Sequence, residues 1–158
     1  MKRIPKLINF ILPALLVITG CKKVFDIKPQ DQLDQTQAYQ NVYDADAAVV
    51  GIYGKFMALA DRYVILNELR GDLLNYTSNA DEALREISTH TVKAGNPYAN
   101  PRPFYELIIN CNDALEHFQV MVKDKRMTDD EFRQRYSDIG ALRSFLFLQL
   151  GIHFGEIP

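Results

Sequence analysis

The feature that most constrains the fold is an apolar stripe in the last third of the chain. Between residues 104 and 122, apolar side chains recur in steps of three and four, the spacing of one helical face. They are Phe104, Ile108, Cys111, Leu115, Phe118 and Val122. The later segment Ile139 to Phe154 is apolar almost all round, which is typical of a helix buried between others. We therefore expect two long helices that share one core, which includes Ile108, Cys111, Leu115, Leu142, Phe145 and Leu146.

The boundaries of these two helices are marked by short signals. Gly95-Asn96-Pro97 and Asn100 to Pro103 are turn sequences, so the first helix is expected to start at Phe104. A charged turn follows at 123–127. Thr128 and Glu131 then have the spacing of a capping box, which predicts a helix start. That helix is expected to run to about Phe154, with Gly155 ending it.

The first half of the chain predicts two further helices. Apolar residues at helical spacing favour one helix over 44–59, with Asp44 as its N-cap, and a second over 63–74. Gly51 and Gly54 are expected to permit close backbone packing. Residues 75–103 are irregular, with a short helix near 79–87. With no convincing alternating run, we expect an all-α fold of two antiparallel helix pairs separated by a long irregular loop.

The N-terminus has the layout of a secretory signal. Lys2, Arg3 and Lys6 precede an apolar stretch from Leu7 to Ile18, and small residues then lead to Cys21. The stretch is too short for a transmembrane helix, which needs about 20 apolar residues. It resembles the lipobox of bacterial lipoproteins. This resemblance implies that residues 1–20 are a signal peptide and that Cys21 becomes a lipidated N-terminus.

The composition of the mature chain narrows the possible ligands. Residues 1–20 carry three basic and no acidic side chains, so their removal takes the net charge from −2 to −5. An acidic domain without a basic patch does not favour nucleic acid as a partner. Cys111 would be the remaining thiol, which excludes an internal disulfide. On the apolar stripe it is expected to be a small core residue.

Three stretches together resemble the SusD/RagB family of outer-membrane lipoproteins. The first is Cys21 with its polar tether, followed by 44–53. The second is Tyr105-x-x-Ile108-x-x-x-Asn112, and the third is Ala141-Leu142-Arg143-Ser144-Phe145 running on to 154–158. Pro103-Phe104 stands where the family often has tryptophan, and Ser144 replaces the usual alanine. Family members are also considerably longer.

The resemblance implies a division of the chain and a fold. Residues 1–20 would be the signal peptide, 21–43 the lipidated cysteine with its tether, and 44–158 an incomplete SusD-like N-terminal helical domain. The helix pairs would resemble tetratricopeptide units, although no 34-residue self-repeat is evident. A part of the apolar helix 139–154 would then remain in water, so we expect this region alone to fold marginally and to bind ligand poorly.

The resemblance also implies a function. The chain would be a lipid-anchored outer-membrane protein, facing the cell exterior, that binds an oligosaccharide or other nutrient. It would deliver that nutrient to a SusC-like TonB-dependent transporter. An alternative is a helical-repeat lipoprotein scaffold that binds protein without a direct ligand, and a third hypothesis is a hydrolase of unknown class.

The candidates for sugar binding are aromatic rings near the irregular region. Tyr76, Tyr98 and Phe104 offer flat faces for stacking, with Asn96 and Asn100 as neighbouring polar groups. The competing interpretation is that Phe104 belongs to the core and that Tyr98 anchors a loop.

Three other residues are expected to be structural: Tyr105, Asn112 and Arg143. Arg143 lies on the apolar helix, where it either points along a solvated edge or forms an ion pair. Its candidate ion-pair partners are Glu68, Asp72 and Glu116.

No motif in the sequence predicts catalysis. His90, His117 and His153 are far apart and do not form a metal-ligand pair. The sequence has no Gly-x-Ser-x-Gly motif and no glycine-rich phosphate loop. We therefore expect no enzymatic activity, no cofactor and no metal.

Overall fold

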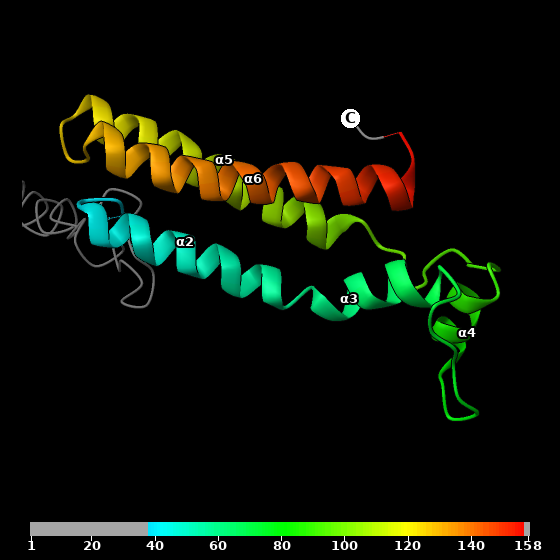
Figure 1. Cartoon of the computed structure of the whole chain (residues 1–158). Coiled ribbons are helices and arrows are strands. Elements are labelled where there is room, and N and C mark those ends of the chain that lie inside the picture. The colour runs from blue at the N-terminus through cyan, green and yellow to red at the C-terminus, as the bar shows by residue number, and fades with distance from the viewer. Residues whose placement is uncertain (1–37, 157–158) are drawn as a thin grey trace, which may run out of the picture. The chain divides into compact units, whose positions relative to one another are not determined.

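The computed structural model describes residues 38–156, which are all-helical (Figure 1). The five α-helices in that range are α2 (Val42–Met57), α3 (Ala60–Val64), α4 (Glu82–Ser88), α5 (Arg102–Lys123) and α6 (Asp129–Phe154). A π-helical segment, η3 (Ile65–Leu69), follows α3 directly. The expected all-α class is confirmed for these residues. The signal peptide, Cys21 and most of the tether lie outside the described residues.

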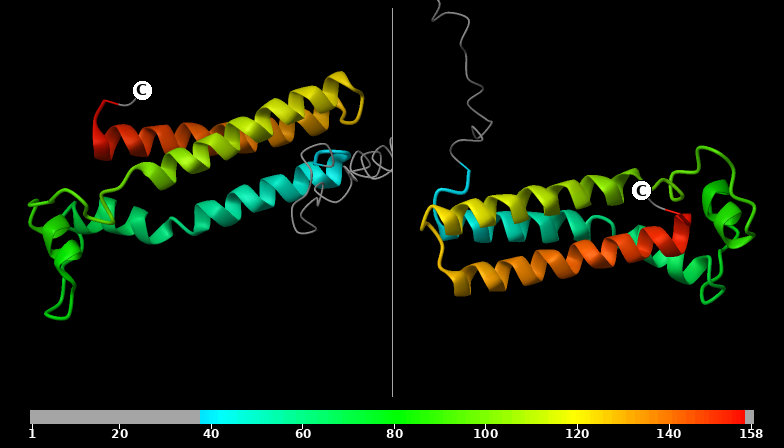
Figure 2. Two further views of the ribbon diagram at one scale, coloured as in Figure 1. Left: turned by 180° about the vertical axis from the view of Figure 1, so that it is seen from behind. Right: turned by 90° about the horizontal axis from the view of Figure 1, so that it is seen from above.

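Helices α5 and α6 form an antiparallel hairpin with extensive mutual contact (Figure 2). The predicted capping box starts α6. The Glu131 amide donates to Oγ1 of Thr128 at 3.3 Å, and the Thr128 amide donates to the Glu131 carboxylate at 2.9 Å. The helix ends at Phe154, and Gly155 follows with a φ of 82°. Both expected boundaries of this helix are therefore confirmed.

Helix α5 starts two residues earlier than expected, at Arg102. Pro103 is accommodated because the amides of the first helical turn need no partner within the helix. The expected stripe is buried at Phe104, Ile108, Cys111, Leu115 and Phe118, and Val122 is half-buried. This stripe is the centre of the core.

Asn41, not Asp44, is the N-cap of α2. Oδ1 of Asn41 accepts from the amides of Tyr43 and Asp44 at 2.9 and 3.2 Å. The Asp44 carboxylate accepts from the Asn41 amide at 3.1 Å, which completes a capping box. The expected cap at Asp44 was wrong because both residue types can cap a helix, and Asp44 takes the reciprocal position in the first turn.

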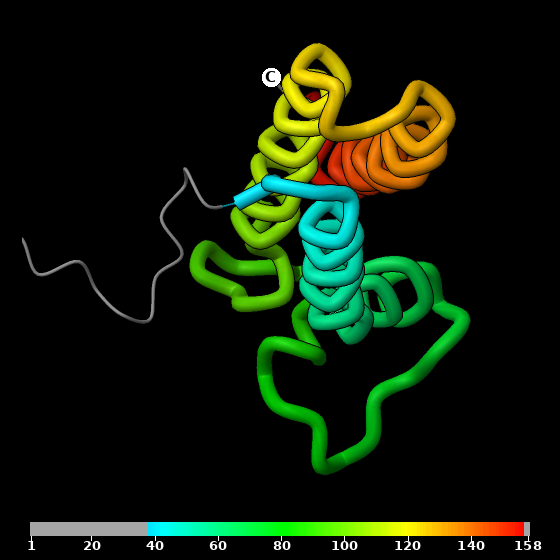
Figure 3. The backbone as a smooth tube through the Cα atoms, turned by 90° about the vertical axis from the view of Figure 1, so that its left-hand side faces the viewer, coloured from blue at the N-terminus to red at the C-terminus, as the bar shows by residue number. Residues whose placement is uncertain are grey.

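Helices α2 and α3 run end to end (Figure 1). Ala58 and Leu59, which join them, both have negative φ and ψ near zero, so the chain bends without reversing. The expected first antiparallel pair, 44–59 with 63–74, is therefore not formed. Helix α2 contacts α5 and α6 instead, and the view along the bundle shows the three long helices side by side (Figure 3). Residues of all three belong to one core.

The π-helical segment ends the second helical stretch earlier than the periodicity indicates. The Arg70 amide donates to the carbonyl of Ile65 at 3.1 Å, five residues back. Asp72 then adopts a φ of 61°, which stops the helix. Leu66 and Leu69 are buried as their phase predicts, whereas Leu73 is exposed.

Helix α6 buries only part of its apolar surface. Leu142, Leu146 and Leu150 are in the core, as expected for the first two. The exposed fractions of Phe145, Leu148 and Ile152 are 39%, 58% and 57%. The prediction that Phe145 is a core residue was therefore wrong, because only its inner edge meets Phe56 and Tyr63. The expectation that part of this helix stays in water is confirmed.

The outer surface of α2 differs from expectation at its glycines. Gly51 and Gly54 are exposed, and a Cβ atom on either would meet nothing within 4 Å. They do not mediate backbone packing within residues 38–156.

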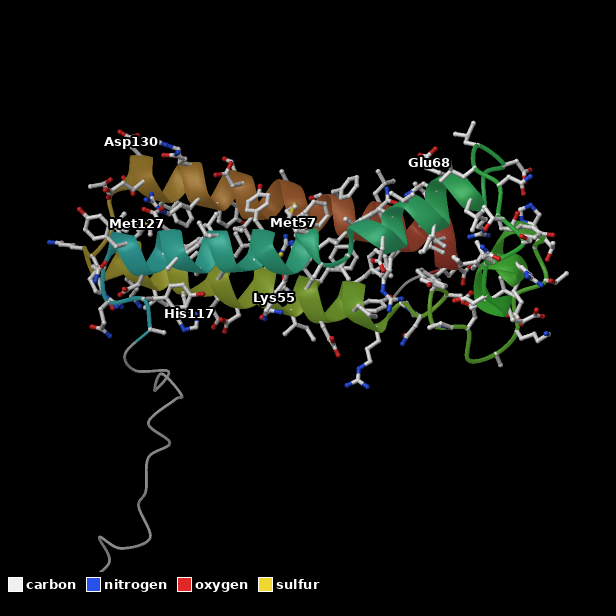
Figure 4. The ribbon with its side chains drawn as sticks, turned by 90° about the horizontal axis from the view of Figure 1, so that it is seen from below. Lys55, Met57, Glu68, His117, Met127 and Asp130 are labelled. Atoms are coloured by element: carbon white, nitrogen blue, oxygen red, sulfur yellow. The ribbon has the colours of Figure 1, made fainter. Side chains whose placement is uncertain are left out.

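A side-chain hydrogen bond joins α2 to α5. Nζ of Lys55, which is labelled in Figure 4, donates to Oδ1 of Asn110 at 2.9 Å.

Candidate functional site

A cavity of about 300 Å³ lies where four segments of the chain meet. It lies near the C-terminal end of α6. Helices α3 and α4 are found at the same end of the bundle (Figure 1). The segments are η3 with its following residue, the end of α4 with the loop after it, the approach to α5, and the last turn of α6. The lining residues are Leu66, Arg70, Ile87, His90, Val92, Ala99, His153 and Phe154.

Apolar and polar groups line this cavity in about equal measure. Leu66 and Ile87 are buried and extend the core into the cavity. Phe154 is half-buried, and its ring contacts Phe104 with centroids 6.1 Å apart. Val92 is 45% exposed, so it lies toward solvent. The cavity is therefore apolar where it meets the core and open at Val92.

Arg70 is the positive group of this cavity. Its Nη1 donates to the backbone oxygen of His153 at 3.1 Å, a contact between residues 83 positions apart. Across residues 38–156, no carboxylate lies within ion-pair distance of Arg70. A guanidinium has five N–H donors, so this single contact leaves most of them for another acceptor.

His153 is fixed by a chain of hydrogen bonds beside Arg70. Nδ2 of Asn67 donates to Oε1 of the buried Gln149 at 3.1 Å, and Nε2 of His153 lies 3.1 Å from the same oxygen. An amide oxygen only accepts, so His153 donates from Nε2. Burial, and secondarily the charge of Arg70, lower the pKa of His153. Both effects favour the neutral imidazole.

A buried carboxylate organises the loop that forms one wall. Glu86 accepts from Nδ2 of Asn96 at 3.0 Å and pairs with Nζ of Lys93 at 2.9 Å. Its hydrogen bonds with Asn96 and Lys93 lower the pKa of Glu86. Asn96 also donates to the carbonyl of Ala83 at 3.0 Å. Residues 93–96 are thereby held against α4. They lie between Val92 and Ala99, the two residues of this loop that line the cavity.

Two of the three predicted sugar-binding rings lie outside this cavity but remain accessible. Tyr76 is exposed, and the guanidinium carbon of Arg85 lies 6.0 Å from its ring centroid. Tyr98 is half-buried and packs on the core, and its amide donates to Oδ1 of Asn96 at 3.0 Å. Both remain candidates for stacking on a sugar.

Phe104 has to be removed from the candidate ligand-binding residues. Its side chain is 0% exposed and contacts the rings of Tyr63 and Phe154. Its position in the apolar stripe of α5 places it in the core, where no ligand reaches it. Asn96 is also buried and satisfied by Glu86, so it does not stand beside a sugar as expected.

Arg143 does not form the expected ion pair, and it is not held by solvent alone. Its Nη1 donates to Oδ1 of Asn112 on α5 at 2.9 Å. Glu68, Asp72 and Glu116 are not its partners. Tyr105 is half-buried and packs on the core. The structure thus brings Asn112 and Arg143 together across the α5–α6 hairpin.

No motif or spacing in the sequence pointed directly to the cavity. Its lining residues span positions 66–154, and no spacing rule relates Arg70 to His153. The only sequence feature related to the cavity was the four-residue separation of Gln149 and His153. This separation places both side chains on one side of a helix.

Residues 38–156 contain neither a membrane-spanning helix nor a cluster of metal ligands. No helix there combines the length and hydrophobicity that crossing a bilayer requires. No group of three or more His, Cys, Asp or Glu side chains there is arranged to hold a metal ion.

Compared with models of protein families, with curated proteins and with solved structures, the chain matches none.

Proposed function

We propose that the chain is an exported lipoprotein, anchored through Cys21, that captures a nutrient at the outer surface of the outer membrane. It passes an oligosaccharide or related nutrient to a SusC-like TonB-dependent transporter. The observation that carries this proposal is the ordered set of motifs: the lipobox-like Gly20-Cys21, the Tyr105 to Asn112 motif, and the 141–145 motif. No nucleic acid, metal, cofactor or catalytic step is part of the proposal.

The contact between Arg143 and Asn112 supports this proposal. These residues belong to the third and second of the resembling stretches, 31 positions apart, and their side chains are hydrogen-bonded. A shared structural role explains why two separate stretches carry residues of the same family pattern. We also propose that the α5–α6 hairpin is one of the family's tetratricopeptide-like helix pairs, because it is antiparallel and joined by a short turn.

The alternative function is a lipoprotein scaffold that binds protein without a nutrient ligand. One observation favours it: Phe145, Leu148 and Ile152 are exposed on one side of α6. Exposed apolar side chains that cluster mark interaction surfaces more often than isolated ones do.

Two experiments distinguish these functions: a purification that identifies bound proteins, and a titration that measures oligosaccharide binding. The tagged full chain is extracted from outer membranes in mild detergent, with Cys21→Ala as the control that lacks the anchor. The importer function predicts that a large β-barrel transporter co-purifies and that at least one oligosaccharide of a panel binds. Tyr76→Ala or Tyr98→Ala should weaken that binding. A transporter-free complex with another protein, without oligosaccharide binding, would favour the scaffold instead.

A further inference from the structure

The cavity between η3, α4 and the end of α6 has the composition of a site for a small organic anion. Leu66 and Ile87 form apolar walls that continue into the core, and Phe154 adds an aromatic surface. Arg70 supplies a positive charge beside them. The volume, about 300 Å³, is at the lower end of the range of ligand pockets, which is about 300–1,000 Å³.

We propose that this cavity binds a small monocarboxylate with an apolar body, such as an arylalkanoic acid. The carboxylate lies on the guanidinium of Arg70, and the apolar body lies against Leu66, Ile87 and Phe154. This ligand class is independent of the proposed function, and the inference stands whether or not the chain binds an oligosaccharide.

Arg70 is suited to hold the carboxylate. Its planar guanidinium matches the two oxygens of a carboxylate and can donate to both. The bond from Nη1 to the His153 carbonyl fixes the side chain across the cavity and uses one of its donors. The absence of an acidic partner within residues 38–156 leaves its charge for a bound anion.

The other charged groups near the cavity do not oppose an anion strongly. Burial favours the neutral form of His153, which donates to Gln149. Asp72 lies 4.0 Å from Nε2 of His90, but both side chains are mostly exposed, so solvent and salt screen the carboxylate. Arg70 is exposed as well, so it favours an anion through direct charge-assisted hydrogen bonds and not through a long-range field.

The lining side chains suit an apolar body better than they suit a neutral sugar. A buried hydroxyl without a hydrogen-bond partner is unfavourable, and a sugar carries several. Arg70, His90 and His153 are the polar side chains among the eight lining residues, and His153 already uses Nε2 toward Gln149. An apolar body leaves no such unsatisfied groups.

The test is a calorimetric titration of the purified full chain with 3-phenylpropionate and with its uncharged analogue 3-phenylpropanol. A ligand of this size is expected to bind with a dissociation constant of about 1 mM or lower. The acid should bind at least about tenfold more tightly than the alcohol, since only the acid gains charge-assisted hydrogen bonds. Equal affinities, or no binding of the acid, would overturn the proposal.

Three variants assign the binding to this cavity. Arg70→Gln should lower the affinity for the acid about tenfold or more and leave the alcohol unchanged. Val92→Glu and Val92→Lys alter an exposed position on the cavity wall, so both should fold, and they should weaken and strengthen acid binding respectively. Arg133→Gln is the matched control, because Arg133 is exposed on α6 and pairs with Asp130. The proposal fails if Arg70→Gln and both Val92 variants bind the acid as the unaltered chain does.

Discussion

Nη1 of Arg143 on α6 donates to Oδ1 of Asn112 on α5 at 2.9 Å, which joins the two halves of the hairpin by their side chains. Asn112 lies one position after the buried Cys111, and Arg143 lies one position after the buried Leu142. The hydrogen bond therefore lies at the exposed edge of the α5–α6 contact.

This relationship predicts a measurable coupling between the two side chains. Arg143→Ala and Asn112→Ala should each destabilise the chain, and the double variant should lose less than the sum. The expected coupling is about 0.5–1.5 kcal/mol, the range for a hydrogen bond in a folded protein. Urea unfolding of the four proteins measures it. Strict additivity would show that the contact does not contribute to stability.

Burial predicts different costs for two phenylalanines on the hairpin. Phe118 is fully buried, so Phe118→Ala should lower the free energy of unfolding by about 3–5 kcal/mol. Phe145 is 39% exposed, so Phe145→Ala should lower it by only about 1–2 kcal/mol. Urea unfolding of each variant and of the unaltered chain measures both losses. A larger loss at Phe145 than at Phe118 would contradict the described packing of α6.

Two glycines are expected to respond in opposite directions to alanine. Gly54→Ala should stabilise the chain by up to about 1 kcal/mol, because the position is helical and a Cβ there meets nothing within 4 Å. Gly71→Ala should destabilise it by about 1–3 kcal/mol, since its Cβ would collide with the backbone oxygen of Asn67 in η3. Thermal unfolding of both variants checks the signs. A stabilised Gly71→Ala protein would be evidence against the π-helical turn.

Stability is expected to fall in alkaline solution. Burial raises the pKa of Cys111 from 9.0 to about 11, and burial raises the pKa of Tyr39 and of Tyr63 from 10.0 to about 12. Each group is more easily deprotonated when unfolded, so its contribution is complete below the unfolded pKa and is lost as the pH rises through the folded pKa. The free energy of unfolding should therefore decline from about pH 9 to pH 12.

Cys111→Ala separates the thiol from the tyrosines in this profile. In that variant the decline should begin near pH 10, because the tyrosines then titrate alone. Urea unfolding at one-half pH steps resolves the difference. Constant stability of the unaltered chain up to pH 12 would be incompatible with the burial of these groups.

The parts of the fold that the sequence predicted depend on local signals. Thr128 and Glu131 satisfy each other's backbone amides within one turn, and the 104–122 stripe repeats over five turns, so both could be read without knowing the partner helix. Asn41 and Asp44 show the limit of such signals, since either can cap and only the folded backbone decides.

The remaining features depend on contacts between distant segments. Phe145 is 39% exposed because α2 and α3 cover only its inner edge. The sequence near Phe145 does not indicate how much of its ring these distant helices cover. Likewise, the end-to-end course of α2 and α3 follows from the backbone angles at Ala58 and Leu59. The cavity could not be predicted because Arg70 and His153 meet only when η3 and the end of α6 are placed together.

We propose that this helical chain is held at a membrane surface through Cys21, and the mature N-terminus tests this proposal most directly. The full chain is purified from membranes of a bacterium that processes lipoproteins, and its N-terminal peptide is analysed by mass spectrometry. We predict a chain that begins at Cys21 and carries added acyl mass, and we predict that Cys21→Ala abolishes both this processing and membrane retention. A chain with unmodified Cys21 that still begins at Met1 would contradict the account.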